Sequence, residues 1–237
     1  MMLGVFGDVH GNLPALEAVI ADGRRIGVDS WICLGDIAFR GPSPRECAEL
    51  VQSVCTVCVM GNTDEWLPRT LPRADGPKAS MLKMWYDWTV PKLSKTTLAW
   101  MHDLPKHHNT ILGGEHLLCC HASLRALEDV VLPTSQDSTF HEAFLTDEHS
   151  LVTSAHIHIP HLLRRNHSTI INTGSVGRPI DGDPRASYVL LRTERDSVSY
   201  EFRRVEYDVQ QAADLALACD MPQKHEFINA IRSGMNF

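Results

Sequence analysis

The chain has 237 residues, of which 43% are apolar and 22% charged, and its formal net charge is −7. This length and composition are typical of a globular protein that buries a sizeable core. No apolar run reaches the roughly 18 residues needed to cross a bilayer, and residues 1–6 lack the basic residues of a secretory signal. The acidic balance argues against a general nucleic-acid binder, which would carry a basic face.

The seven cysteines are an odd number and lie in apolar runs such as 54–60 and 117–120. Free thiols of an intracellular protein explain this distribution better than a disulfide framework, so we expect a cytoplasmic protein. Cys55 and Cys58 have the spacing of a zinc or redox pair. They fall inside a predicted strand, and no second pair follows at zinc-like spacing, which favours a buried strand.

The first part of the chain alternates between strand-like and helix-like runs. Residues 2–6 predict a strand, and residues 13–26 predict an amphipathic helix with apolar positions at helical spacing. A second strand over 30–34, a helix over 44–52 and a third strand over 54–60 complete a βαβαβ unit. This order predicts a mostly parallel sheet with right-handed connections.

Residues 63–106 interrupt this alternation with a segment rich in proline and tryptophan. Helix-like runs near 79–89 and 93–102 predict a helical excursion that covers one end of the sheet. We expect Trp85, Trp88 and Trp100 to form the core of this excursion, with stacking on a nucleobase as the alternative.

The remaining residues predict short strands followed by two helices. The strands cover 111–112, 116–120, 151–154, 168–172, 186–192 and 198–205, and the last two predict an antiparallel hairpin. His107 and His108 are expected in a loop. Helices are predicted over 209–218 and 223–233, and no internal repeat or linker is present. We therefore expect a single domain over residues 1–237.

Short polar motifs follow five of the predicted strands, where α/β proteins place functional loops. They are Gly7-Asp8-Val9-His10, Gly35-Asp36, Gly61-Asn62, His121 and Ala155-His156-Ile157-His158. Each has an ordinary explanation alone, since Gly-Asp after a strand is usually a turn and a single His is usually a satisfied side chain. Together they supply carboxylate, amide and imidazole groups at strand ends. That mixture is what two neighbouring divalent metals with one shared carboxylate require.

This ordered set resembles the calcineurin-like metallophosphoesterase superfamily over nearly the whole chain, and in particular its small bacterial and archaeal phosphodiesterase branch. The stretches 41–47 and 172–179 support that branch. The resemblance implies an α/β (α+β) fold, a four-layer αββα sandwich of two mixed β-sheets flanked by helices. It also implies a phosphoesterase that hydrolyses its substrate with a hydroxide held between two metal ions.

The resemblance further implies the ligands of each metal. Asp8, His10 and His158 would bind the first metal, Asn62, His121 and His156 the second, and Asp36 would bridge both. Asp36, His10 and Arg40 would be the catalytic residues. The family uses manganese, iron or zinc, and mixed nitrogen and oxygen ligands suit any of these.

Two positions depart from many members of the superfamily. A His commonly follows the Gly-Asn motif, backed by an Asp three residues beyond the bridging Asp, and this pair is thought to protonate the leaving group. The two positions here are Thr63 and Phe39. Branches that lack the His often favour diesters or good leaving groups, so we expect a phosphodiester substrate. Ala155 also stands where Gly usually precedes the His pair, and replacing Gly by Ala is a small change.

Three further residues lie beside these motifs. Arg40 matches the phosphate-gripping Arg of the family's Gly-Asp-x-x-x-Arg-Gly motif, with a surface salt bridge as the alternative. Arg178, in a glycine-rich loop, is a weaker candidate for the same role. Asp64 is expected to steady the loop that holds Asn62 without being a ligand.

Other functions compete with phosphodiester hydrolysis. Within the enzyme class, the alternatives are a diadenosine-polyphosphate hydrolase and a phosphomonoesterase or protein phosphatase. A non-catalytic scaffold is disfavoured because all seven ligand positions are filled. The expected partner is a small phosphate-ester substrate, with nucleotides among the candidates, and not a membrane or a long polynucleotide. The natural substrate and the oligomeric state stay open.

Overall fold

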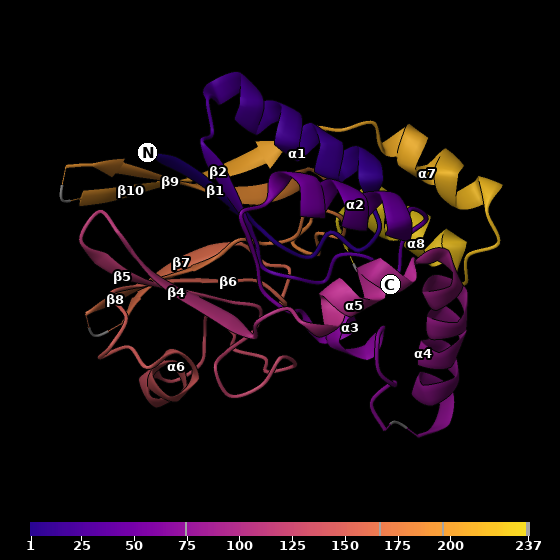
Figure 1. The fold of residues 1–237 in the computed structure, drawn as a ribbon, viewed down its shortest axis with the longest axis horizontal. Helices are drawn as coiled ribbons and strands as arrows, with labels where there is room; N and C mark the ends of the chain where they lie inside the picture. Colours follow the sequence, from indigo (N-terminus) through magenta and orange to yellow (C-terminus); the bar gives the residue numbers. More distant parts are fainter. Residues whose placement is uncertain (74, 166, 196, 236–237) are drawn as a thin grey trace.

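Two five-stranded mixed sheets lie face to face, with helices on both outer sides (Figure 1). The computed structural model describes residues 1–73, 75–165, 167–195 and 197–235. The predicted four-layer αββα sandwich is therefore confirmed. No helix within these ranges is both long enough and apolar enough to cross a membrane. The expectation of a single domain stays a prediction.

The first sheet has the strand order β10-β9-β1-β2-β3. β1 (Met2–Phe6), β2 (Ser30–Cys33) and β3 (Val57–Cys58) are parallel neighbours. β9 (Ala186–Glu194) pairs antiparallel with β1 and forms the expected hairpin with β10 (Ser197–Val205). Because β1, β2 and β3 run in the same direction, the loops that follow them leave the sheet at the same edge.

The second sheet has the strand order β4-β5-β6-β8-β7. Its parallel centre is formed by β5 (Glu115–Cys120), β6 (Leu151–Ser154) and β8 (Ser168–Asn172). The edges are antiparallel, with β4 (His107–Leu112) beside β5 and β7 (His161–Arg165) beside β8. The loops after β5 and β6 therefore also leave at one edge.

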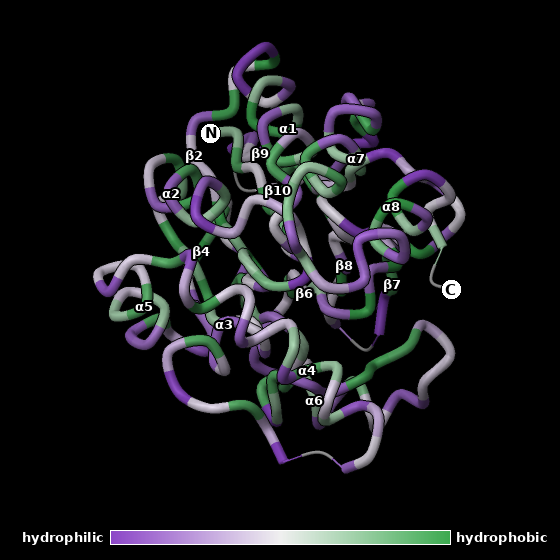
Figure 2. The backbone as a smooth tube through the Cα atoms, turned by 90° about the vertical axis from the view of Figure 1, so that its right-hand side faces the viewer, coloured by the Kyte–Doolittle hydropathy of each residue, from purple (hydrophilic) through white to green (hydrophobic). Residues whose placement is uncertain are grey.

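Helices cover the outer face of each sheet. α1 (Leu13–Ile26), α2 (Pro44–Val54), α7 (Val209–Ala218) and α8 (Lys224–Ser233) pack on the first sheet. α6 (Asp137–Phe144) packs on the second sheet. The alternation of hydrophobic and hydrophilic stretches along helices such as α1 can be followed in Figure 2. This alternation gives each helix one apolar face to bury against its sheet.

The core between the sheets follows from strand alternation. Leu3 and Val5 of β1 point into the apolar layer shared with the second sheet, whereas Phe6 points toward the helices. Successive strand residues face opposite sides, so one strand contributes to both apolar layers. β1 consequently lies between two buried layers and holds the loop that follows it rigidly.

The excursion after β3 is helical, as predicted. It contains α3 (Asn62–Trp66), α4 (Gly76–Thr89), a 3₁₀ turn (Val90–Lys92) and α5 (Lys95–His102). Of the three tryptophans expected in its core, Trp85 is buried, whereas Trp88 and Trp100 are only partly buried.

Several predicted boundaries are wrong. The third strand, expected over 54–60, is confined to Val57–Cys58 because α2 extends to residue 54. Cys55 and Cys58 therefore do not share a buried strand: Cys55 follows α2, and both are partly exposed. His107 and His108 belong to β4 and not to a loop, since this edge strand pairs with β5 along its whole length.

Four elements were not predicted from the sequence, namely α3, α6, β7 and the 3₁₀ turn at Val90–Lys92. α3 has five residues, which is too short for helical periodicity to appear. The residues of β7 are all partly or fully exposed, so burial does not alternate along the strand. Pairing with β8 in the assembled sheet is what makes this segment a strand.

Candidate metal centre

The side chains predicted as metal ligands meet at the edge of the sandwich where parallel strands of both sheets end. They come from the loops after five strands: Asp8 and His10 after β1, Asp36 after β2, Asn62 after β3, His121 after β5, and His156 and His158 after β6. All are buried except His156 and His158, which are partly exposed. The structure thus brings together all seven residues that the sequence singled out.

One group of these side chains surrounds Asp8. The Nε2 atoms of His10 and His158 lie 3.9 Å and 3.4 Å from Asp8 Oδ1. The two Nε2 atoms are 3.1 Å from each other. One oxygen and two nitrogen atoms therefore converge on a single point, at a separation suited to a common cation.

A second group surrounds His121. Its Nε2 atom lies 3.0 Å from Asn62 Oδ1, 3.2 Å from His156 Nδ1 and 3.6 Å from Asp36 Oδ1. The other oxygen of Asp36 lies 3.7 Å from His10 Nε2, in the first group. The Asp36 carboxylate therefore lies between the two groups and presents one oxygen to each.

Backbone carbonyl groups fix the protonation of three imidazole rings. The Nδ1 atoms of His10, His121 and His158 lie at hydrogen-bond distance from the carbonyl oxygens of Phe39, Leu34 and Arg178. A carbonyl oxygen can only accept, so each neutral ring carries its proton on Nδ1 and a bare lone pair on Nε2. These Nε2 atoms are the ones that converge in the two groups. Two facing lone pairs at 3.1 Å repel unless a proton or a metal cation lies between them.

Asp8 gives a second indication that a cation fits here. Its Oδ2 accepts the His156 backbone N–H at 2.9 Å, but its buried Oδ1 has no hydrogen-bond partner among the described residues. A buried carboxylate oxygen without a partner is costly. The Oδ1 atom is also the one that faces the His10 and His158 nitrogens. The donor set therefore fits a divalent metal.

Burial and charge shift the pKa values of the cluster. Burial, and next the charge of Asp8, raise the pKa of Asp36 to about 6. Burial lowers the pKa of His10, His121 and His156. At His158, burial is outweighed by the charge of Asp8 and a hydrogen bond to it, so the pKa of His158 is raised. Neutral imidazoles are the form that binds metals, and two crowded carboxylates are relieved by a cation between them.

The backbone is strained at the cluster. Six non-glycine residues here have left-handed φ values: Asp8 (54°), His10 (47°), Asp36 (55°), Arg40 (74°), His156 (68°) and His158 (57°). This region is uncommon for residues with a side chain and costs on the order of 1–3 kcal/mol each. Such strain persists at functional sites, where the surrounding structure imposes it.

Close packing between the loops explains the adjacent glycines. A Cβ atom on Gly61 would lie 2.3 Å from the backbone nitrogen of Asp36. A Cβ atom on Gly35, whose φ is +90°, would lie 2.3 Å from the nitrogen of Gly61. Any side chain at either position would separate the loops that carry Asp36 and Asn62.

Asp64 holds these two loops together. Its carboxylate accepts the backbone N–H groups of Asp36 (2.7 Å), Ile37 (3.0 Å) and Gly61 (3.0 Å). Burial, and next the charge of Asp36, raise its pKa to about 7. The prediction that Asp64 steadies the Asn62 loop is confirmed, and the contact extends to the Asp36 loop. Thr63 adds to it, because its N–H and hydroxyl both donate to Asp36 Oδ1 at 2.9 Å.

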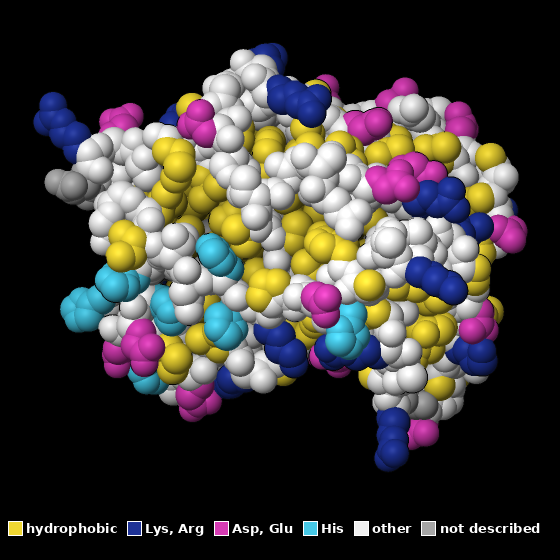
Figure 3. Space-filling model, viewed as in Figure 1, with side chains coloured by type: hydrophobic (Ala, Val, Ile, Leu, Met, Phe, Trp, Pro, Cys, Tyr) yellow, Lys and Arg dark blue, Asp and Glu magenta, His cyan; other side chains and the backbone are white. Residues whose placement is uncertain are grey.

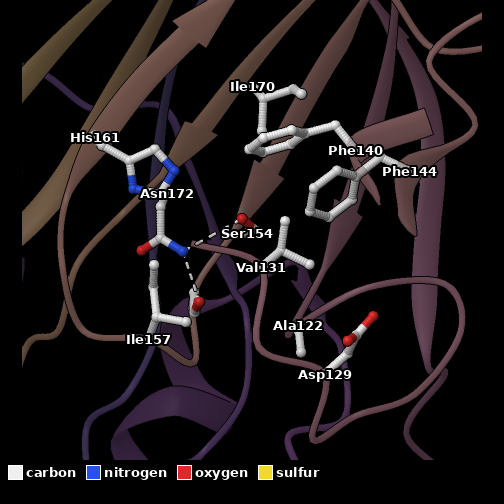
Figure 4. A pocket seen from close by; sticks show the side chains of 11 residues that line it. Ala122, Asp129, Val131, Phe140, Phe144, Ser154, Ile157, His161, Ile170 and Asn172 are labelled. Atoms are coloured by element: carbon white, nitrogen blue, oxygen red, sulfur yellow. Dashed lines mark hydrogen bonds between the residues drawn. The ribbon is translucent and has the colours of Figure 1, made fainter. Parts of the chain in front are cut away.

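Asn172 supports the loop that carries the two distal histidines and was not singled out from the sequence. Figure 4 shows its amide between Ser154 and the segment at Ile157. Asn172 Nδ2 donates to the carbonyl oxygen of Ala155 (2.6 Å) and to Ser154 Oγ (3.3 Å). The only signal for it in the sequence is its place at the start of the 172–179 stretch.

A pocket of about 520 Å³ opens over the ligand cluster. Its polar and charged lining includes Arg40, Arg178 and Thr63. Its apolar lining residues are Trp66, Leu82, Val130, Leu132, Ile157, Ile159 and Ile180. This mixture of side chains suits a ligand that carries both an anionic group and an organic group.

The two arginines have different surroundings. Arg178 is buried and pairs with Glu226 through Nη2 and Oε1 at 3.2 Å. Arg40 forms no salt bridge with any described residue, and the charges of Glu226 and Asp36 act on it from a distance. The surface-salt-bridge explanation of Arg40 therefore finds no support in the described part of the chain.

Comparison with known proteins identifies the family of this chain. The sequence model of the calcineurin-like phosphoesterase superfamily domain matches residues 1–196. The protein MJ0912 of Methanocaldococcus jannaschii is 28% identical over 239 residues, covering 94% of each chain.

Solved structures of other proteins are similar to this chain along nearly its whole length. A metallophosphoesterase from Sphaerobacter thermophilus aligns with a TM-score of 0.79 and 29% identity, covering 99% of each chain. The protein PH1004 from Pyrococcus horikoshii has the same fold, with a TM-score of 0.83, 22% identity, and coverage of 100% of this chain and 99% of its own. By sequence and by fold, the chain belongs to the calcineurin-like phosphoesterase superfamily.

Proposed function

We propose that this protein is an enzyme that hydrolyses a small phosphodiester with the help of two divalent metals. The observation that carries the proposal is the position of Asp36 between two groups of nitrogen and oxygen donor atoms. Its Oδ2 lies 3.7 Å from His10 Nε2, and its Oδ1 lies 3.6 Å from His121 Nε2. A carboxylate shared in this way is the arrangement of two-metal hydrolases.

The ligands divide between the two metals as the family pattern implies. We assign Asp8, His10 and His158 to one metal, Asn62, His121 and His156 to the other, and Asp36 to both. Two bound cations would acidify the attacking water and neutralise the charge on the phosphate oxygens. The mixed donors suit manganese, iron or zinc.

Arg40 and Arg178 are proposed to bind the phosphate. Both line the pocket over the ligands. Burial, and next the charge of Arg40, lower the pKa of Arg178. Two neighbouring guanidinium groups repel each other until an anion is bound, and their planar forks suit phosphate oxygens. The two arginines thereby supply local positive charge in a protein whose formal net charge is −7.

Three features support a small diester. A pocket of about 520 Å³ has the volume of a small-molecule site. Its apolar lining residues can accept one organic group of the ester. Thr63, which occupies the position of the usual proton-donating His, has no proton to give at neutral pH. A monoester with a poor leaving group would need such a donor.

The cellular location is part of this proposal. All seven cysteines are free thiols, which is typical of a reducing compartment. We therefore propose a cytoplasmic enzyme.

A comparison of ester classes tests the proposed function. With Mn²⁺ present, we expect bis(p-nitrophenyl) phosphate to be hydrolysed faster than p-nitrophenyl phosphate, and cyclic nucleotides and diadenosine tetraphosphate serve as further substrates. Asp36→Asn should abolish the activity, because both metals lose a ligand. Asp87→Asn, a substitution at an exposed position on α4, should retain the activity. Faster monoester or dinucleoside polyphosphate hydrolysis would favour the alternatives, and full activity of Asp36→Asn would exclude the metal assignment.

A further inference from the structure

Three thiols gather on the first sheet, apart from the metal ligands. Cys33 ends β2, and Cys58 ends β3 as its register partner in the parallel pair. Cys55 follows the last residue of α2. The side chains of Cys33 and Cys55 both contact that of Cys58. The three residues, named here the thiol cluster, are all in the reduced form.

A groove of about 380 Å³ opens onto two of these thiols. It is lined by Cys55 and Cys58 together with Trp100 of α5 and His108 of β4. Figure 3 shows hydrophobic side chains exposed on this face of the molecule between α2 and α5. Cys33 is fully buried, whereas Cys55 and Cys58 are partly exposed. A small oxidant in the groove can therefore reach Cys55 and Cys58.

The surroundings of Cys58 favour its thiolate form. The thiols of Cys33 and Cys55 donate to its sulfur and lower the pKa of Cys58 to about 5, against the opposing effect of burial. Burial, and next the contact with Cys58, raise the pKa of Cys33 and of Cys55 well above the usual range. These contacts therefore favour ionisation of Cys58 over that of Cys33 or Cys55. Thiolates are the form of cysteine that oxidants attack.

We propose that Cys58 is a site of oxidation by peroxides and that Cys55 is its resolving partner. The Cys58 thiolate attacks one peroxide oxygen, the O–O bond breaks, and a sulfenic acid and hydroxide are formed. The Cys55 sulfur then attacks the Cys58 sulfur, so the S–S bond forms as the S–O bond breaks and water leaves. In sum, two thiols lose two electrons and two protons, and hydrogen peroxide is reduced to two water molecules.

Access and backbone position assign Cys55, and not Cys33, as the partner. Cys33 lies within β2, and a bond to its register neighbour Cys58 would bridge two hydrogen-bonded strands in the buried layer under the helices. Cys55 lies in the short connection between α2 and β3. That connection can adjust its backbone without separating paired strands.

Peptide mapping of the full chain after mild peroxide treatment tests the proposal. Trypsin would leave Cys55 and Cys58 in the peptide 46–69, which also contains Cys47, and Cys33 in the peptide 26–40. We expect the protein to lose about 2 Da, the mass of two hydrogens, and fragmentation to place the disulfide between Cys55 and Cys58. Dithiothreitol should restore both thiols.

Three variants serve as controls, each compared with the wild type after the same treatment. Cys58→Ser should prevent the disulfide, and Cys55→Ser should leave Cys58 as a sulfenic acid that dimedone labels. Cys219→Ser, which removes another partly exposed thiol, should leave the disulfide unchanged. A cross-link between peptides 26–40 and 46–69, or oxidation elsewhere while Cys55 and Cys58 stay free, would overturn the proposal. So would a disulfide at Cys55 in the Cys58→Ser variant.

Discussion

Backbone carbonyl groups set the direction of three imidazole rings in the metal centre. Phe39, for example, has an apolar side chain, yet its backbone carbonyl oxygen accepts from His10 Nδ1 at 3.0 Å. The hydrogen bond leaves Nε2 free to bind a metal and raises its basicity. A carbonyl group is present in every residue, so this part of the site tolerates a change of side chain.

Thr63 gives the first prediction at the scale of single residues. Because it cannot supply a proton to the leaving group, we expect log(kcat/KM) to fall steeply as the leaving-group pKa rises. The measurement is a series of substituted phenyl diesters at fixed pH and saturating Mn²⁺. Thr63→His should recover part of the roughly 10²–10⁴-fold that general acid catalysis typically contributes. Thr63→Ser, which keeps the hydroxyl beside Asp36, should preserve the slope. A flat dependence with chemistry rate-limiting would mean that another residue donates the proton.

Asp64 gives the second prediction. In Asp64→Asn, an amide NH₂ replaces one oxygen that now accepts backbone N–H groups at 2.7–3.0 Å. We expect the free energy of unfolding to fall by about 1–3 kcal/mol and Mn²⁺ affinity to fall about 10–100-fold. Urea unfolding and metal titration measure these effects. Asp87→Asn, the matched control, should change stability by less than about 0.5 kcal/mol. Unchanged Mn²⁺ affinity in Asp64→Asn would show that Asp64 does not position the ligands.

At the scale of elements, the helices after β3 support the loop that carries Arg40. The Phe39 ring packs against Trp66 of α3 and Trp85 of α4, with centroids 5.8 Å and 6.2 Å away. Trp85 is 2% exposed. We expect Trp85→Ala to lower the free energy of unfolding by about 3–5 kcal/mol, because it leaves a cavity beside Phe39. Trp88→Ala, at a partly exposed position, should cost clearly less in the same denaturant titration. If the two variants lost the same free energy of unfolding, α4 would be held in place by contacts other than those of Trp85 with Phe39.

A partly buried ion pair joins α1 to the hairpin of β9 and β10. Asp22 accepts from Tyr188 at 2.8 Å and pairs with Arg203 at 3.0 Å. Burial raises the pKa of Asp22, but hydrogen bonds from Tyr188, Arg25 and Arg203 together lower it below the usual value of an aspartate. The folded state therefore holds this proton less tightly than the unfolded chain. Its contribution to stability is present above about pH 4 and is lost as the pH falls below that value.

The corresponding test compares Asp22→Asn with the wild type across pH. We expect a loss of about 1–3 kcal/mol near pH 7, which shrinks as the pH falls below about 4 because the wild-type carboxylate is then protonated. Chemical denaturation at several pH values measures the difference. A difference that stays constant from pH 7 to pH 3 would show that the charge of Asp22 is not what joins the helix to the hairpin.

At the scale of the whole molecule, metal binding should join the two sheets. The ligands come from loops of both sheets, so a bound metal stabilises the folded sandwich and not the unfolded chain. At 100 times the dissociation constant the gain is about 2.7 kcal/mol, which corresponds to a rise in Tm of roughly 5–10 °C for a chain of this size. Differential scanning fluorimetry with Mn²⁺ or with a chelator measures it. Asp36→Asn should lose the shift and Asp87→Asn should keep it. A Tm that responds to neither Mn²⁺ nor chelation would contradict the metal centre.

Local signals in the sequence determined the first strand and helix and the order of the ligands. Asn12 caps α1 by accepting from the Ala15 backbone N–H, and Gly27 ends the helix with φ +83°. Both signals act within one turn, so the bounds of α1 could be predicted without knowledge of the fold. The ligand loops could be predicted because each polar motif directly follows an apolar strand.

Elements that depend on neighbours could not be predicted in the same way. α6 is a short helix that buries Phe140 and Phe144 against the second sheet, and β7 is a strand because β8 lies beside it. Only the packed sheets decide whether such segments become helix or strand.

The same division holds at the metal centre. The sequence by itself determined which ligand types stand at which strand ends. The tertiary structure alone decided which lone pairs converge, that Asp64 also contacts the Asp36 loop, and that Asn172 supports the loop after β6. His10 and His158 meet at 3.1 Å although 148 positions separate them in the chain. Side-chain patterns act over a few residues, whereas a contact of this range depends on how two whole sheets pack together.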